Sequence, residues 1–142
     1  MIPLQLRLEN FMCYRQADLD FRDIRLACLS GENGSGKSAL LDSITWALWG
    51  KARARRDDDL IRLGETEMAV ELVFALGEAR YRVIRRRSSQ GRGQSVLELQ
   101  GWDPQAGVYR PLTEPTIRKT QARINSLLRM DYETFINSAF LL

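Results

Sequence analysis

Hydrophobic and polar residues alternate in several short runs of the sequence, a pattern that predicts strands with one buried face. The alternating runs are residues 4–8, 17–21, 68–74, 81–83, 96–99 and 108–109. A turn is expected at residues 76–78, where Gly77 separates two of the runs. Residues 24–29 are more continuously apolar, which is typical of a strand buried on both faces. The pattern therefore predicts several half-buried strands and one internal strand.

Three segments instead place their apolar residues at helical spacing. The first carries Leu40, Leu41, Ile44, Ala47 and Leu48, and Gly50 is its expected end. The second begins near Pro115 behind Thr113, a candidate N-cap, and its apolar stripe is Ile117, Ile124, Leu127 and Leu128. The third is capped by Asp131, and its stripe is Tyr132, Phe135, Ile136, Ala139 and Phe140.

Residues 51–59 separate the first helix from the later strands. They contain four basic residues followed by three aspartates and have few apolar side chains. We expect an exposed loop there.

Composition narrows the class of protein only moderately. The 142 residues make one domain, with 44% hydrophobic and 27% charged residues and no apolar run near the ~18 residues of a membrane span. With no histidine and only two cysteines, histidine acid–base chemistry and most transition-metal sites are excluded. The net charge of +3 permits nucleic-acid contact without requiring it. A cytoplasmic protein is expected.

The strongest motif is a glycine-rich loop between the internal strand and the first helix. It reads Gly31-Glu32-Asn33-Gly34-Ser35-Gly36-Lys37-Ser38 and matches the phosphate-loop pattern of Gly, four residues, Gly-Lys-Ser. Glycines let backbone N–H groups curl around a triphosphate, and the helix that follows directs its positive dipole end at the phosphates. Lys37 would contact the β- and γ-phosphates, and the Ser38 hydroxyl would bind Mg²⁺. The loop therefore predicts an ATP site.

A hydrolase also needs a carboxylate at the end of an apolar strand to hold Mg²⁺ and polarise water. Glu71 is the nearest candidate, but the alternation of residues 68–71 makes it a surface residue of a half-buried strand. The catalytic carboxylates are therefore expected outside this chain.

The order of these motifs resembles the start of the SbcC and Rad-fifty class of DNA double-strand-break-repair ATPases, members of the SMC (structural maintenance of chromosomes) superfamily. The matching stretches are residues 8–11, 29–44, 59–64, 81–86 and 135–140. They extend over essentially the whole chain, and their order and spacing carry the resemblance.

The resemblance implies an α/β fold of the P-loop NTPase type: the N-terminal lobe of an ABC-type ATPase head, with a phosphate-loop sheet plus an antiparallel β layer. In that family a long coiled coil separates this lobe from a C-terminal segment with the signature motif and the acidic strand. Residues 1–142 would be the N-terminal half of the head, truncated before the coiled coil. The complete protein would hydrolyse ATP, and this chain alone would be inactive.

The resemblance also implies partners and cofactors. ATP and Mg²⁺ would be bound between this lobe and the signature motif of a second head. The further partners would be the C-terminal half of the same ATPase, an SbcD-type metal-dependent nuclease and double-stranded DNA, with no membrane. In a bacterium the protein would be associated with the nucleoid.

Carried over by position, the resemblance assigns a nucleotide-binding set. The phosphates would be wrapped by Asn33, Gly34, Ser35, Gly36, Lys37, Ser38 and Ala39, with Lys37 catalytic, while Ile61, Arg62 and Leu63 would pass near the base. Many relatives have a basic residue where this chain has Met12, and Arg15 is close enough in sequence to replace it.

Five arginines crowd the segment of residues 80–87, and two interpretations are open. Arg80 and Arg82 share a face opposite Tyr81 and Val83, so we expect them to face solvent. They either contact the phosphate backbone of duplex DNA or keep a sheet edge solvated. Of the three tryptophans, Trp46 and Trp49 are expected in the core.

Three alternatives to the repair class stay open at this level. The chain could come from another SMC-type or RecF-like DNA-associated ATPase head, whereas a long heptad region interrupted by Cys-x-x-Cys beyond Leu142 would favour the repair class. It could be part of a transporter nucleotide-binding subunit, which shares the loop and the antiparallel layer. It could also be a structural half without activity of its own.

Overall fold

The computed structural model describes residues 1–21 and 35–140. The predicted strand at residues 24–29 and the first half of the phosphate loop lie outside the described residues. For residues 35–37 and 138–140 the backbone alone is described.

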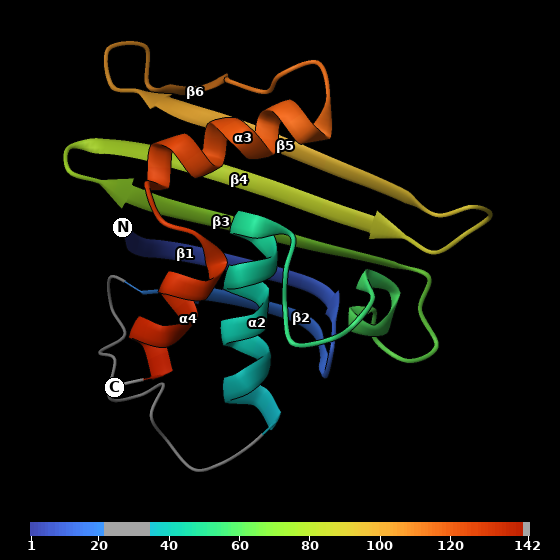
Figure 1. Cartoon of the computed structure of the whole chain (residues 1–142). Helices are drawn as coiled ribbons and strands as arrows, with labels where there is room; N and C mark the ends of the chain where they lie inside the picture. Colours follow the sequence, from blue (N-terminus) through green and yellow to red (C-terminus); the bar gives the residue numbers. More distant parts are fainter. Residues whose placement is uncertain (22–34, 141–142) are drawn as a thin grey trace.

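Six strands form one antiparallel sheet in the described part of the chain, in the order β2-β1-β3-β4-β5-β6 (Figure 1). The strands are β1 (Ile2–Phe11), β2 (Tyr14–Asp20), β3 (Glu67–Leu76), β4 (Ala79–Ser88), β5 (Gln94–Asp103) and β6 (Val108–Pro111). The predicted alternating runs lie in these strands, except that Phe21 lies one residue beyond the end of β2. The alternation does not mark the strand ends, because β2 already begins at Tyr14, directly after the two-residue turn that follows β1.

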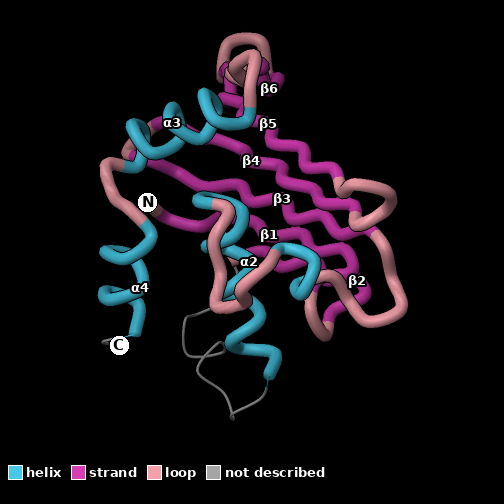
Figure 2. The backbone as a smooth tube through the Cα atoms, turned by 45° about the vertical axis from the view of Figure 1, so that its right-hand side comes forward, coloured by secondary structure: helices cyan, strands magenta, loops and turns pink. Residues whose placement is uncertain are grey.

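The helices lie on one face of the sheet and leave the other face open (Figures 1 and 2). Helix α2 (Ser35–Trp49) crosses the strands, and its first turn extends past the β2 edge. Helix α3 (Ile117–Leu128) lies over β4 and β5, and α4 (Tyr132–Phe140) lies beside α2. The predicted α/β class is confirmed, and the antiparallel layer is its described part.

The core fills the space between α2 and the sheet. Alternate residues of β1 and β3 point toward the helix, so Leu6, Leu8 and Leu72 have no exposed surface. The Phe11 ring lies 6.0 Å from that of Trp46 in α2. The predicted burial of both helix tryptophans is confirmed. The fully or nearly fully buried side chains include Leu6, Leu8, Phe11, Trp46, Leu48, Leu60, Val70, Leu72, Phe74, Val83, Leu99 and Ile124.

Two glycines end elements where the sequence predicts. Gly77 has φ +59° in the two-residue turn between β3 and β4. Gly50 has φ +68° directly after α2, and its N–H donates to the carbonyl oxygen of Trp46 at 2.8 Å. Both positions require left-handed backbone, which glycine adopts without steric cost.

The N-cap of α3 is Thr116 and not Thr113, so that prediction was wrong. The Thr116 hydroxyl accepts from the N–H of Lys119 at 3.1 Å, and the helix begins at Ile117. Thr113 instead accepts from the N–H of Leu99 at 3.0 Å and so attaches the chain to β5. Ile117, predicted in the apolar stripe, is 41% exposed because it lies in the first turn, away from the sheet.

The segment after α2 is largely exposed, as predicted, but it is also attached to the fold and is therefore not a plain solvated loop. Arg53 forms a forked pair with Asp42 of α2, with Nη2 to Oδ2 at 2.8 Å and Nε to Oδ1 at 3.1 Å. Asp42 is only 2% exposed. Residues Asp57–Leu60 form a short 3-10 helix, η1. Asp58 of this helix forms an ion pair with Arg87 of β4, with Oδ1 and Nε 2.9 Å apart.

Helix α4 begins as predicted from its cap residue. The carboxylate of Asp131 accepts from the N–H of Thr134 at 2.8 Å, and hydrogen bonds from Thr134 lower the pKa of Asp131. The indole N–H of Trp49 donates to the carbonyl oxygen of Met130 at 3.0 Å, and the Phe135 ring lies 5.2 Å from the Trp49 ring. These contacts hold α4 beside the end of α2.

We predict that Thr116→Ala lowers the free energy of unfolding by about 1 kcal/mol, because the N–H of Lys119 loses its acceptor. Thr116→Ser keeps the hydroxyl and should retain most of the stability. Urea unfolding followed by circular dichroism measures both. Equal losses in the two variants would contradict the capping role.

A second prediction concerns the ion pair of α2. Asp42→Asn should lower the free energy of unfolding by about 2 kcal/mol, because a buried acceptor loses its charge-assisted bonds. It should also expose the segment around Arg53 to trypsin.

The matched control for this prediction is Asp18→Asn. Asp18 pairs with Arg7 at 3.4 Å, and both side chains are more than 60% exposed. Such a pair contributes less than about 1 kcal/mol. Equal destabilisation by the two substitutions would show that Arg53 does not anchor the segment.

Candidate functional site

The first turn of α2 coincides with the end of the glycine-rich motif. The helix begins at Ser35, so Lys37 and Ser38 lie in its first turn, which carries no acidic residue. The first N–H groups of a helix have no intrahelical acceptors and therefore favour an anion. Ser38 is half-buried and Ala39 is fully buried. Asn33 and Gly34 lie outside the described residues.

A second part of the candidate site is formed by the β1–β2 turn and the residues after η1. The N–H of Met12 donates to the carbonyl oxygen of Leu60 at 2.7 Å. The N–H of Arg62 donates to the carbonyl oxygen of Asn10 at 2.8 Å. Asn10 and Met12 both have φ +52°, a left-handed conformation that is uncommon outside glycine. This paired backbone holds residues 60–62 against the turn.

The three residues expected near the base differ in exposure. Ile61 is only 8% exposed and packs in the core, whereas Leu63 is 95% exposed. Arg62 is partly exposed and lies 3.9 Å from Glu65, measured between Nη1 and Oε1. A leucine this exposed, on a backbone held by hydrogen bonds, offers an apolar surface to a planar ligand.

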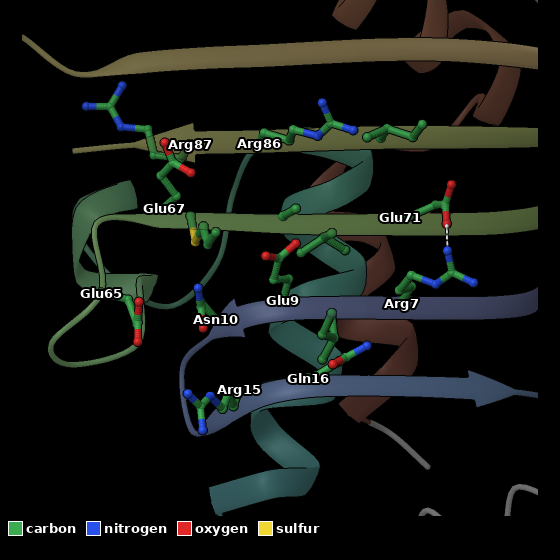
Figure 3. A pocket seen from close by; sticks show the side chains of 15 residues that line it. Arg7, Glu9, Asn10, Arg15, Gln16, Glu65, Glu67, Glu71, Arg86 and Arg87 are labelled. Carbon is green, nitrogen blue, oxygen red and sulfur yellow. Dashed lines mark ion pairs between the residues drawn. The ribbon is translucent and has the colours of Figure 1, made fainter. Parts of the chain in front are cut away.

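Arg15 and Met12 lie in different surroundings, which bears on the prediction that Arg15 supplies the basic contact missing at Met12. Met12 is partly buried and packs against the core. Arg15 is exposed on β2 and lies among the residues around a cavity on the open face of the sheet (Figure 3). A role of Arg15 at the nucleotide stays a prediction.

That cavity, of about 790 Å³, lies over β1, β3 and β4 (Figure 3). Its lining carries both signs of charge, with Glu9 and Glu67 among the acidic residues and Arg15 and Arg86 among the basic ones. The mixed charge gives no preference for a polyanion such as a triphosphate. We therefore place the candidate nucleotide site at α2 and not in this cavity.

Glu71 lies on the same open face and is engaged in ion pairs. Its carboxylate is 3.6 Å from Arg7 Nη1 and 3.6 Å from Arg82 Nε; Figure 3 shows the pair with Arg7. The prediction that Glu71 is a surface residue of a half-buried strand is confirmed.

The arginines of β4 divide between the two faces of the sheet. Arg80 is exposed, and its guanidinium lies 5.3 Å from the centroid of the Trp102 ring. Arg82 is half-buried, because it donates to Gln100 Oε1 at 2.7 Å and stacks 4.1 Å from the Tyr109 ring. The expectation of two solvent-facing arginines therefore holds for Arg80 and only in part for Arg82.

Arg85 and Arg87 lie on the helix-covered face, which the crowding of arginines in the sequence did not reveal. Arg87 is bound to Asp58 of η1, and Arg85 is only 8% exposed beneath the end of α2. The strand alternation that places Val83 in the core also places Arg85 there. These two side chains are unsuited to a surface that binds DNA.

Two features are absent from the described part of the chain. It contains no helix long and apolar enough to cross a membrane. Nor do residues 1–21 and 35–140 bring three or more acidic or cysteine side chains together in a way that could hold a metal ion.

Similar proteins of known sequence are ATPases and nuclease components. Residues 5–141 match the AAA domain family. The chain is 37% identical over 145 residues to the SbcC component of the nuclease SbcCD of Deinococcus radiodurans, covering 99% of this chain and 16% of that protein. It is 40% identical over 96 residues to the DNA double-strand break repair Rad50 ATPase of Thermoplasma volcanium, covering 68% and 10%.

Solved structures of the recombination mediator protein RecF share the fold. RecF-ATP superposes with a TM-score of 0.56 at 17% identity, covering 80% of this chain and 28% of that chain. A second RecF structure gives 0.58 at 18% identity, covering 86% and 29%.

The resemblance found in the sequence is thereby confirmed, although the chain spans less than a fifth of the length of these curated relatives. Its AAA match, its repair-ATPase relatives and its RecF-like fold agree with one another, and the chain belongs to the AAA domain family as a segment similar to the SbcC and Rad50 ATPases.

Proposed function

We propose that this chain is the ATP-binding N-terminal segment of an SbcC-like ATPase head that drives DNA end processing and double-strand-break repair. The observation that carries the proposal is the phosphate-loop motif leading directly into α2, a helix that begins at Ser35 and is buried against the sheet. The names of the relatives, a nuclease component and a repair ATPase, support the reaction class.

The triphosphate would lie at the N-terminal end of α2. Backbone N–H groups of Asn33 to Ala39 would wrap it, and the dipole of the helix would favour its negative charge. The Lys37 ammonium would approach the β- and γ-phosphates, where charge develops during transfer. The Ser38 hydroxyl would hold Mg²⁺, which would supply positive charge to stabilise the negative charge of the phosphates.

The base would lie over the segment after η1. Leu63 offers an exposed apolar side chain, and Arg62 a partly exposed guanidinium that can stack on a planar ring. The buried side chain of Ile61 would fix this segment in place and would not contact the base itself. Hydrogen bonds to the β1–β2 turn limit the motion of its backbone.

Hydrolysis requires groups that this segment does not supply. Glu71 is engaged with two arginines on the open face, so the carboxylates that hold Mg²⁺ and polarise water would come from the C-terminal half of the head. A second head would cover the nucleotide with its signature motif, and a metal-dependent nuclease would cut DNA. In the proposed assembly, ATP binding closes the heads and hydrolysis reopens them.

The proposed contact with duplex DNA would involve arginines of β4. Arg80 is exposed and is the better candidate for a phosphate contact. Arg82 is already bound to Gln100 and Glu71, so a phosphate would have to compete with both.

A RecF-like ATPase head is the second candidate, because the two RecF structures share this fold at 17–18% identity. Co-expression with the C-terminal half of the head distinguishes the two. An ATPase whose activity depends on a nuclease partner favours the SbcC class. A transporter subunit would require docking on a membrane protein.

We predict that Lys37→Ala weakens ATP binding by at least about tenfold, because the triphosphate loses its principal cation. The measurement is isothermal titration of the head reassembled from this chain and its C-terminal half, followed by a DNA-stimulated ATPase assay. Lys51→Ala, just beyond the other end of α2, is the matched control. Unchanged affinity in Lys37→Ala would refute the site.

We also predict that Leu63→Asp weakens ATP binding by about tenfold with no loss of stability, because a carboxylate would replace the apolar surface under the base. Val108→Asp places the same charge on an exposed apolar residue, 47% exposed, of the distant strand β6. If both substitutions changed the affinity equally, the effect would come from net charge and not from contact with the base.

A further inference from the structure

Two side chains from other elements hold the C-terminal end of α2. The last carbonyl groups of a helix have no intrahelical donors. Arg85 of β4 donates from Nε to the carbonyl oxygen of Ala47 at 3.2 Å. Gln121 of α3 donates from Nε2 to the carbonyl oxygen of Leu48 at 2.7 Å. Arg85 Nη2 also donates to Gln121 Oε1, so the two side chains form one unit, the α2 clamp (Arg85 and Gln121).

Among the described residues, no carboxylate is hydrogen-bonded to the buried guanidinium of Arg85. Burial lowers the pKa of Arg85 to about 10, and the charge of Asp57 opposes this shift. Arg85 donates instead to a helix carbonyl and an amide oxygen. The C-terminal end of a helix carries partial negative charge, which offsets part of the cost of burying the guanidinium.

The surroundings of the guanidinium leave room for it. A Cβ atom at Gly50 would lie 2.9 Å from Arg85 Nη1, so a larger residue there would displace the side chain. The guanidinium also lies 5.9 Å from the centroid of the Trp46 ring. An apolar side chain at this position would bury area without the desolvation cost. The guanidinium differs from an apolar side chain because its hydrogen bonds are directional and fix the position of the last turn of α2.

We propose that Arg85 is a positioning residue for nucleotide binding. Through the α2 clamp it sets the position of α2 along the helix axis and its rotation about that axis. The 15-residue helix is a rod of about 22 Å, so displacement of one end moves the other. Apolar packing along its length is non-directional, whereas the hydrogen bonds of the α2 clamp act in fixed directions on its last turn. The inference rests on the proposed function, since it requires phosphates at the N-terminal turn.

The test uses the reassembled head and the dissociation constant of ATP. Arg85→Met removes the charge and the guanidinium donors but keeps an unbranched side chain of similar apolar bulk, and we expect about tenfold weaker binding. Arg85→Lys keeps the charge and N–H donors but lacks the planar guanidinium, so its loss should be smaller. All titrations are made at a temperature where circular dichroism shows each variant to be folded.

Val83→Ala is the matched control for destabilisation. Val83 is fully buried on the same face of β4, two residues before Arg85, and has no bond to the carbonyl groups of α2. It should lower the melting temperature and leave ATP affinity unchanged. Gln121→Leu removes the α2 clamp from the side of α3 and tests the same inference if Arg85→Met does not fold.

The outcomes separate this inference from the proposed function. Weaker binding in Arg85→Met and Gln121→Leu, with Val83→Ala unchanged, supports the inference. If Val83→Ala lost as much affinity, or if the variants of Arg85 and Gln121 that fold lost none, Arg85 would be structural only. If Lys37→Ala then still weakened binding, the nucleotide site would stand. A wild-type head that binds no ATP would overturn the proposed function itself.

Discussion

Burial of α2 against the antiparallel sheet is the packing interaction on which the other parts of this molecule depend. Trp46, Ala47 and Leu48 are at most 1% exposed, and the rings of Phe11 and Trp46 are in contact range. The helix therefore cannot leave the sheet without exposing its largest aromatic side chain. Since the phosphate-loop motif ends in its first turn, the same packing determines where the motif can present its N–H groups.

Directional polar contacts also determine the position of α2 on the sheet, in addition to apolar packing. Asp42 on α2 binds Arg53, Trp49 binds the backbone of Met130, and the α2 clamp binds the last turn. These contacts come from a loop, from the segment before α4, and from β4 and α3.

The candidate site was only partly predictable from sequence. The spacing of Gly31, Gly36, Lys37 and Ser38 is local information, and it identifies the phosphate loop without any knowledge of the fold. The exposure of Leu63 and the burial of Ile61 are not local. They follow from backbone hydrogen bonds between residues 60–62 and the β1–β2 turn, some fifty positions earlier in the chain. Hydrophobic periodicity predicts which residues are buried, but it does not predict which residues they contact.

The sequence by itself determined the strand alternation, the glycines that end elements and the Asp131 cap, because each depends on backbone preferences within a few residues. Tertiary structure decided which of two nearby threonines caps α3, since Thr113 is held by Leu99 of β5. It also decided that Arg85 and Arg53 have partners on α2, where a charged run alone indicates solvent. The physical reason is that a buried charge is stabilised only by groups that folding brings to it.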